Sequence, residues 1–340
     1  MRLDIDGRNC ELESGRSILD AVKKEGLDSI MLSDRPLAAQ IGGEVFNLRF
    51  TPKKDTQIHL LRYGEDMGRR VYERTLQFLF ILAMRKEFPR ARVCVRYSLG
   101  PGLFITVDGM EEPFNEEAAL KVETEMRRLV RLKLPLERRR ISIKEALSFY
   151  EQDGQADKAK LLKWRRFSYF DVYQIDGYMD YFYGEMAPDT SYADVFRVKY
   201  VHDGAVVLLM PRNDAPDVPS DYVDLPKLNA VFHQSDEWGR LMECATVNDL
   251  NTHIQNGTIR ELVRINEALH DRGYADIADK IVQKGAKAVL VAGPSSSGKT
   301  TSAHRISTQL RLQGCHPVML SLDDYYIDRD KIERDENGEI

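Results

Sequence analysis

The feature that most constrains this sequence is a strand–loop–helix pattern over residues 288–314. Residues 288–292 form a short apolar run, rich in β-branched side chains, that predicts a buried parallel strand. The sequence GPSSSGKT at 293–300 follows at once and matches the phosphate-loop pattern G-x-x-x-x-G-K-[ST]. Residues 301–313 then predict a helix that ends at Gly314. This order of elements is the context in which the motif binds nucleotide phosphates.

The residue types in the loop suit this chemistry. Gly293 and Gly298 permit backbone angles that turn successive N–H groups toward phosphate oxygens. Lys299 supplies a positive charge for the terminal phosphates, and the Thr300 hydroxyl is predicted to ligate Mg²⁺. The sequence therefore predicts ATP or GTP binding with Mg²⁺. The residues predicted to bind the nucleotide are Gly293, Pro294, Ser295, Ser296, Ser297, Gly298, Lys299, Thr300 and Thr301.

A second apolar run, residues 317–322, predicts a second buried strand, and Asp323 stands at its end. Because ligands gather at the carboxyl ends of strands in open α/β sheets, Asp323 is expected to face the same crevice as Lys299. Its carboxylate suits a general base, but Asp is also a favoured helix N-cap. Position alone leaves both interpretations open.

The sequences GPSSSGKTT and LSLDDYY resemble the uridine kinase and phosphoribulokinase group of P-loop kinases. The resemblance covers about the last 55 residues. It implies Lys299 and Asp323 as catalytic residues, with Asp323 as the base, and Tyr326 as a contact with the acceptor nucleoside. The activity it implies is an ATP-dependent phosphotransferase acting on uridine or cytidine. The residues leave ribulose 5-phosphate and pantothenate-type acceptors open.

The N-terminal residues 1–62 predict a hairpin around Gly7, a helix from Ser17 to near Gly26 and further strands around Gly42 and Gly43. The segments GRSILDAVKKEG and AAQIGGEVFNL, in that order, resemble the TGS domain, a β-grasp module of threonyl-tRNA synthetases.

Residues 63–225 resemble the domain of the same synthetases that edits mischarged tRNA. The likeness rests on LPLERRRISIKEALSFYEQDGQADKAKLL and VYQIDGYMDYFYGEMAPDT. By position, the H-x-x-x-H pair and the later Cys and His of that domain are replaced here by Arg74, Phe78, Phe182 and Met186. Phe can neither ligate zinc nor carry a proton, and Arg and Met serve neither purpose. The sequence predicts a retained scaffold without the hydrolytic chemistry.

A basic run over Arg127–Arg140 is the strongest positive cluster in the chain. It fits either a solvated helix face or a contact with an RNA backbone. A set of aromatic residues fits either base stacking or a packed sheet face: Tyr178, Tyr181, Phe182, Tyr183 and Tyr192.

Composition narrows the class of protein. Lys and Arg number 49 against 54 Asp and Glu, a balance that argues against broad nucleic-acid binding by net charge. There is no apolar run of 18 residues and no secretory signal pattern, so a cytoplasmic protein without membrane association is expected. The four isolated cysteines predict free thiols in a reducing compartment.

These patterns predict four parts: a β-grasp module at 1–62, an editing-like α+β domain at 63–225, a helical connector at 226–284 and the front of an α/β P-loop kinase domain at 285–340. The last part has room for two strands only, so the chain is expected to be a fragment cut inside that domain. Two alternatives stay open: a regulatory P-loop ATPase that binds tRNA, and N-terminal domains that serve as a homodimerisation scaffold.

Overall fold

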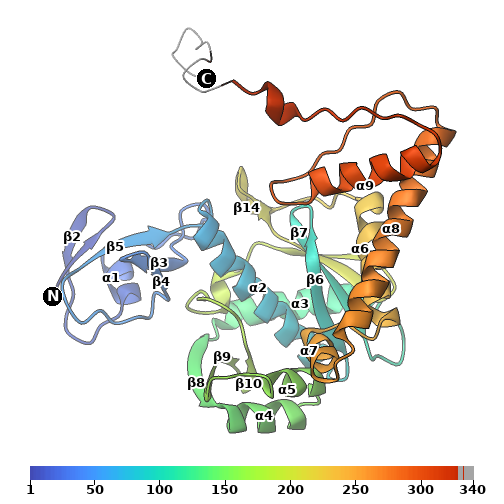
Figure 1. The fold of residues 1–340 in the computed structure, drawn as a ribbon. Helices are drawn as coiled ribbons and strands as arrows, with labels where there is room; N and C mark the ends of the chain where they lie inside the picture. Colours follow the sequence, from blue (N-terminus) through green and yellow to red (C-terminus); the bar gives the residue numbers. More distant parts are fainter. Residues whose placement is uncertain (328–331, 333–340) are drawn as a thin grey trace. The chain divides into compact units, whose positions relative to one another are not determined.

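The structure is a computed structural model that describes residues 1–327 and Ile332 (Figure 1). The chain divides into two compact units, Met1–Trp238 and Gly239–Ile340. Helices occur together with several small sheets, which makes the protein α+β, as predicted for its N-terminal part. Among the described residues, no helix combines the length and the apolar character needed to cross a membrane.

A five-stranded sheet at the N-terminus has the strand order β2-β1-β5-β3-β4. Its strands are β1 (Arg2–Ile5), β2 (Arg8–Glu11), β3 (Ala38–Ile41), β4 (Glu44–Phe46) and β5 (Thr56–Leu61). Strand β1 pairs antiparallel with β2 and parallel with β5. Helix α1 (Ile18–Lys24) begins at a capping box between Ser17 and Asp20. Its buried side chains share one core with alternate residues of β1 and β5, as period-two burial requires.

The largest core belongs to two long helices and a four-stranded antiparallel sheet of order β11-β12-β7-β6. The strands are β6 (Arg92–Leu99), β7 (Gly102–Asp108), β11 (Arg197–His202) and β12 (Ala205–Leu209). The helices are α2 (Asp66–Glu87) and α3 (Glu116–Leu132), which begins at the side-chain cap of Asn115. Every residue of β12 is buried, because α2 and α3 contribute to the core on one face and residues such as Leu225 to the core on the other.

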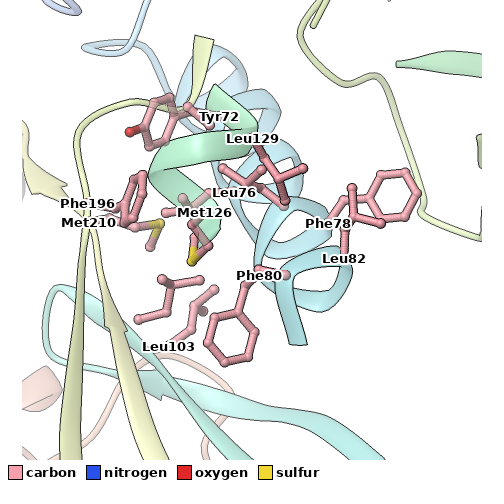
Figure 2. Close-up of a cluster of buried hydrophobic side chains, with 14 of the residues drawn as sticks. Tyr72, Leu76, Phe78, Phe80, Leu82, Leu103, Met126, Leu129, Phe196 and Met210 are labelled. Atoms are coloured by element: carbon pink, nitrogen blue, oxygen red, sulfur yellow. The ribbon is translucent and has the colours of Figure 1, made fainter. Parts of the chain in front are cut away.

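Helix α2 buries side chains on two sides (Figure 2). Leu76 and Phe80 point toward Met126 of α3 and Leu103 of β7, whereas Phe78 and Leu82 point the other way. Phe78 there packs against Tyr178, with ring centroids 5.8 Å apart. The broad apolar stripe of α2 thus joins two neighbouring sheets to one helix.

A small lobe is built on the three-stranded sheet β10-β9-β8. Its elements are β8 (Glu137–Ser142), β9 (Tyr169–Ile175), β10 (Tyr178–Asp180), α4 (Ile143–Gln152) and α5 (Ala156–Leu162). Ile141, Phe170 and Val172 form a core with Ala146, Tyr150 and Ala159 of the two helices. The opposite face of β8 and β9 presents Arg138, Arg140 and Tyr169, since paired residues of an antiparallel ladder share a face.

The remaining elements of the first unit are a short 3₁₀ turn η1 (Thr190–Tyr192), a hairpin β13 (Pro211–Arg212) and β14 (Ala215–Pro219), and helix α6 (Pro226–Leu241), in which the unit ends. The proline-rich sequence predicts a long loop from Asn213 to Pro226, and this expectation is wrong in part. Two prolines, Pro211 and Pro219, face each other in the hairpin. A two-stranded edge tolerates residues without an N–H donor.

The second unit contains helices α7 (Val247–Gln255), α8 (Ile259–Gln283) and α9 (Lys299–Leu312) and the 3₁₀ turn η2 (Leu322–Tyr325). Its core is small: Ala278 of α8 packs with Ile306 and Leu310 of α9. Tyr274 and Ser302 join the same two helices by a hydrogen bond of 3.3 Å between their hydroxyls.

The two strands predicted at 288–292 and 317–322 are absent from the described part of this unit. The side chain of Leu290 is 94% exposed and that of Leu320 is 74% exposed. An apolar run becomes a strand only when neighbouring backbone satisfies its N–H and C=O groups, and no strand of the second unit pairs with either segment within the described residues. The predicted front of an α/β kinase sheet is therefore not shown.

Candidate functional site

The phosphate loop begins helix α9 as the motif predicts. Gly298 is the N-cap of α9 at φ +80°, in the left-handed region that glycine enters without strain. A Cβ atom on Gly293 would lie 2.8 Å from the Ser297 Oγ, so a side chain there would require Ser297 to move. Lys299 Nζ donates to the Pro294 carbonyl oxygen at 2.8 Å, so its positive charge lies over the loop. This arrangement places a lysine and a helix N-terminus around one turn of backbone.

Asp323 and Tyr326 lie at the turn η2. Asp323 lies in the first turn of η2, whose N-cap is Ser321. Asp323 is therefore not a helix N-cap, which was one of its two interpretations from the sequence. Tyr326 is 79% exposed. Among the described residues, neither side chain forms a hydrogen bond or ion pair with Lys299 or Thr300. The catalytic role of Asp323 and the substrate contact of Tyr326 stay predictions.

The four positions that correspond to the editing residues gather in the first unit. The rings of Phe78 and Phe182 lie 5.4 Å apart, and Met186 is fully buried in the same core. Arg74 Nε donates to the Glu185 carbonyl oxygen at 2.9 Å. A Cβ atom on Gly184 would lie 2.9 Å from the Arg74 Cζ, so the guanidinium rests directly on the chain at this glycine. Apolar packing and one arginine thus occupy this place.

Arg74 has an unusual environment for a guanidinium. Burial lowers the pKa of its guanidinium below the ordinary value, and burial likewise raises the pKa of the adjacent Glu73 carboxyl. Within the described residues, Arg74 has no carboxylate in ion-pair range, and its Nη1 and Nη2 atoms have no hydrogen-bond acceptor. Unpaired N–H groups on a half-buried guanidinium suit an incoming anion.

The Glu185 side chain contacts a second arginine, Arg138. Its carboxylate accepts from the Tyr173 hydroxyl at 2.9 Å and pairs with Arg138. Arg138 also donates to Asp171, which Arg140 engages at 2.8 Å. Hydrogen bonds from Arg140 and Arg138 hold the pKa of Asp171 below its ordinary value of 3.8.

The basic run Arg127–Arg140 is largely paired. Arg127 pairs with Glu123 at 2.7 Å and Arg128 with Glu125 at 2.6 Å, both on α3. Among the described residues, Arg139 donates only to the neutral Gln174 side chain on the neighbouring strand. Because acidic partners neutralise four of its arginines, the run as a whole offers a phosphate backbone less charge than its sequence indicates.

The rings of the predicted aromatic set differ in how far they are buried. Tyr178 is buried, and Tyr181, Phe182 and Tyr192 are partly buried against cores. Tyr183 is 77% exposed. The packed interpretation therefore holds for four of these rings, and stacking on a ligand stays open for Tyr183. Among the described residues, no group of three or more His, Cys, Asp or Glu side chains is placed to hold a metal ion.

Among the known proteins to which this chain is similar in sequence are tRNA ligases. Over 194 residues, 57% of this chain, the sequence is 25% identical to the threonine–tRNA ligase of Clostridium kluyveri. The ligase of Carboxydothermus hydrogenoformans is 27% identical over 175 residues, and that of Symbiobacterium thermophilum is 26% identical over 194 residues. This chain is similar to threonine–tRNA ligases. It covers 30%, 26% and 29% of those three proteins, respectively. No protein-family model matches the chain.

These relatives overturn the predicted nucleoside kinase. They are tRNA ligases rather than phosphotransferases, so the function predicted for this chain and its assignment as a P-loop phosphotransferase are wrong. The resemblance to threonyl-tRNA synthetases is supported, whereas the resemblance to uridine kinases is not. The error came from a motif of eight residues, which specifies a local phosphate-binding geometry and no acceptor.

Proposed function

We propose that this chain binds tRNA through its first unit, Met1–Trp238, and that it does not hydrolyse an aminoacyl ester. The observation that carries the proposal is the similarity over 194 residues to enzymes whose common substrate is tRNA. The proposal concerns binding alone, because less than a third of each ligase is covered.

The packing around Phe78 supports binding without hydrolysis. Hydrolysis of an ester needs an activated water and therefore a general base or a metal ligand near it. Phe78, Phe182 and Met186 carry neither, and their side chains pack into the core. The domain limits 1–62 and 63–225 belong to this proposal as a β-grasp module and an editing-like scaffold.

Arg74 supplies a contact for the RNA in this scaffold. Its two Nη atoms have no acceptor among the described residues, and a fork of N–H donors matches the geometry of a phosphate. Tyr173 and Arg138 hold Glu185, whose carbonyl oxygen in turn holds the Arg74 Nε. A phosphate of the RNA would complete the hydrogen bonds of this guanidinium.

The phosphate loop belongs to the same proposal as a nucleotide site. Backbone N–H groups of residues 293–299 and the Lys299 ammonium would bind the phosphates of ATP, and the Thr300 hydroxyl would ligate Mg²⁺. Lys299 already lies over the loop through Pro294, and exchanging that carbonyl for a phosphate oxygen replaces a neutral acceptor by a charged one.

A titration of the full chain with unmodified tRNA tests the main proposal. Fluorescence anisotropy at several salt concentrations should give binding that weakens as salt rises, because phosphate contacts release counterions. Arg74→Gln should weaken binding and reduce the salt slope by about one phosphate contact. Arg90→Gln, on an exposed ion pair with Glu111, is the matched control.

The same preparation tests the chemistry. Incubation with a mischarged tRNA should leave the ester intact at the rate seen without protein. Absence of tRNA binding at about 50 mM salt would overturn the proposal, since electrostatic contacts are strongest there. Faster loss of the ester would overturn its second half alone.

A further inference from the structure

The small lobe of β8, β9 and β10 carries exposed aromatic rings beside arginines. Phe167 is 61% exposed, Tyr183 is 77% exposed and Tyr169 is 38% exposed. Large apolar rings at the surface are costly to leave in water unless something covers them. We term six residues the aromatic strip: Arg140, Arg165, Phe167, Tyr169, Tyr181 and Tyr183.

One half of the aromatic strip runs from β8 to the loop before β9. The Arg140 Cζ lies 4.2 Å from the centroid of the Tyr169 ring, and the Tyr169 and Phe167 centroids are 5.9 Å apart. The Arg165 Cζ lies 5.8 Å from the Phe167 centroid. These contacts fix two exposed rings between two guanidinium groups.

The other half continues through a buried ring. The Arg165 Cζ lies 4.8 Å from the centroid of Phe170, whose ring is 5.3 Å from Tyr181. Tyr181 and Tyr183 are 5.7 Å apart at their centroids. The aromatic strip is thus one connected series of contacts, supported from below by the lobe's own core.

The charge beside the aromatic strip is positive. Residues 158–170 contain five Lys and Arg side chains and no Asp or Glu. Lys158 pairs with Asp180 and Lys160 approaches Asp157. Lys163 and Arg166 are exposed and have no acidic partner within the described residues. A ligand that covers these rings therefore meets uncompensated positive charge.

We infer that the aromatic strip binds unpaired nucleotides of an RNA, with bases stacked on Phe167 and Tyr183 and phosphates held by Lys163 and Arg166. Stacking platforms interleaved with cations are how proteins hold single-stranded nucleic acid. Bases in a duplex are already stacked on each other, so exposed rings select an unpaired segment. The inference rests on the proposed tRNA binding and assigns it further residues, of which Tyr183 directly precedes Gly184, where Arg74 contacts the chain.

The test uses the full chain and two fluorescent probes, a tRNA and a short oligouridylate, with an RNA duplex as competitor. Phe167→Ala and Tyr183→Ala should each weaken binding of the oligouridylate by about 5- to 150-fold, the usual loss of a base-stacking ring. Tyr325→Ala removes a ring that is 70% exposed in the other unit and should leave affinity unchanged. Arg166→Gln should reduce the salt slope by about 0.7, the value for one phosphate of a single strand.

The outcomes separate the inference from the function on which it rests. If the chain binds tRNA and both ring variants match the unmodified protein, the aromatic strip is not the surface and tRNA binding stands. If the oligouridylate binds through the rings but tRNA does not bind, the aromatic strip is upheld and the proposed function falls. A duplex that competes as well as the single strand would overturn the selection of unpaired nucleotides. Unchanged circular dichroism of the ring variants shows that a loss of binding is not unfolding.

Discussion

The two units of this protein differ in whether a short apolar run is buried or exposed. In the first unit, the run Ala205–Leu209 is buried at every residue, because β12 has a strand on each side and contributes side chains to a core on both faces. In the second unit, the comparable run at 288–292 has no strand partner within the described residues, and Leu290 is almost fully exposed. An apolar run therefore predicts burial only where the chain also supplies a backbone partner and a cover.

The largest effect should come from the first unit's core. Phe80→Ala removes a fully buried ring from α2 and should lower the free energy of unfolding by about 3–5 kcal/mol through lost burial and the cavity left behind. Urea unfolding followed by circular dichroism measures it. Leu312→Ala, at a residue 77% exposed on α9, is the control in the second unit and should change little. Equal losses for both variants would contradict the contrast between the units.

A buried carboxylate gives the next largest effect. Asp180 is 3% exposed, accepts from Lys158 Nζ at 2.6 Å and from the Tyr178 hydroxyl at 3.1 Å. Asp180→Ala should cost about 3 kcal/mol, since it leaves the buried Tyr178 hydroxyl and the partly buried Lys158 ammonium without their acceptor.

The second unit offers the matched pair for this carboxylate. Asp271 pairs with Arg305 at 3.1 Å, but both side chains are at least half exposed. Asp271→Ala should cost less than about 1 kcal/mol because water replaces the interaction. Urea midpoints of the two variants give the comparison, and a larger loss for Asp271→Ala would reverse it.

The sequence predicts well those elements that have a periodic pattern and partners close in the chain, and it predicts the others poorly. The apolar spacing over residues 69–88 and 116–132 predicts two helices, and the alternation of Leu103, Ile105 and Val107 predicts a strand. The structure has α2 at Asp66–Glu87, α3 at Glu116–Leu132 and β7 at Gly102–Asp108, because each pattern also has partners close in the chain. Strand β8 was missed, since Arg138–Arg140 break the apolar alternation, and Arg138 and Arg140 pair instead with Asp171 across the sheet. The strands at 288–292 and 317–322 were predicted from apolar runs beside the phosphate loop, and such runs do not show whether backbone partners exist.

The candidate sites also differ in how much of each could be predicted from the sequence. The backbone geometry of the loop at 293–298 was predictable because its glycines act locally, and Gly298 takes a left-handed angle, whereas nucleotide binding there stays a prediction. Tyr183 of the aromatic strip belongs to the aromatic set predicted from the sequence, whereas Phe167 and Tyr169 were missed, although the run KWRRFSY at 163–169 carried the signal of basic residues interleaved with aromatics. Arg74 was identified only as a departure from a family pattern; its unpaired guanidinium required the structure.

A pair of glycines tests whether the second unit depends on its helices. Gly298→Ala places a side chain at φ +80° and should destabilise the start of α9 by about 1–2 kcal/mol. Gly273→Ala lies inside α8 with no heavy atom within 4 Å of the added Cβ and should stabilise that helix by about 0.5–1 kcal/mol. Hydrogen exchange of peptides from α8 and α9 measures both, and the same sign for the two variants would contradict the assigned backbone angles.

A smaller, pH-dependent effect belongs to the first unit. His59 places Nε2 2.7 Å from Glu65 and Nδ1 2.9 Å from Asp6, and the hydrogen bond to Glu65 chiefly raises its pKa above the ordinary 6.5. Since the folded pKa is raised, this stabilisation is complete below about pH 6.5 and is lost as pH rises through the folded pKa. The side chain is half exposed, so the contribution stays below about 1 kcal/mol.

The variant His59→Gln isolates this contribution. Urea midpoints of the unmodified protein and the variant should differ at pH 6 and converge at pH 9, where the imidazole is neutral in both folded and unfolded chains. A difference that persists unchanged at pH 9 would assign the effect to packing rather than to charge.

The smallest expected effect bears most directly on the contrast between the units. None of the residues 288–292 has a backbone hydrogen bond within the described part of the chain, so their amides should exchange at nearly the rate of an unfolded peptide, while amides of β12 stay protected. Leu290→Ser should change the free energy of unfolding by less than about 0.5 kcal/mol, because its side chain already lies in water. If the variant instead lost more than about 1 kcal/mol and the amides proved protected, the run would be a buried strand in solution. The strand predicted from the sequence would then stand. The contrast between a first unit with buried strands and a second unit whose described elements are helical would fail at this segment.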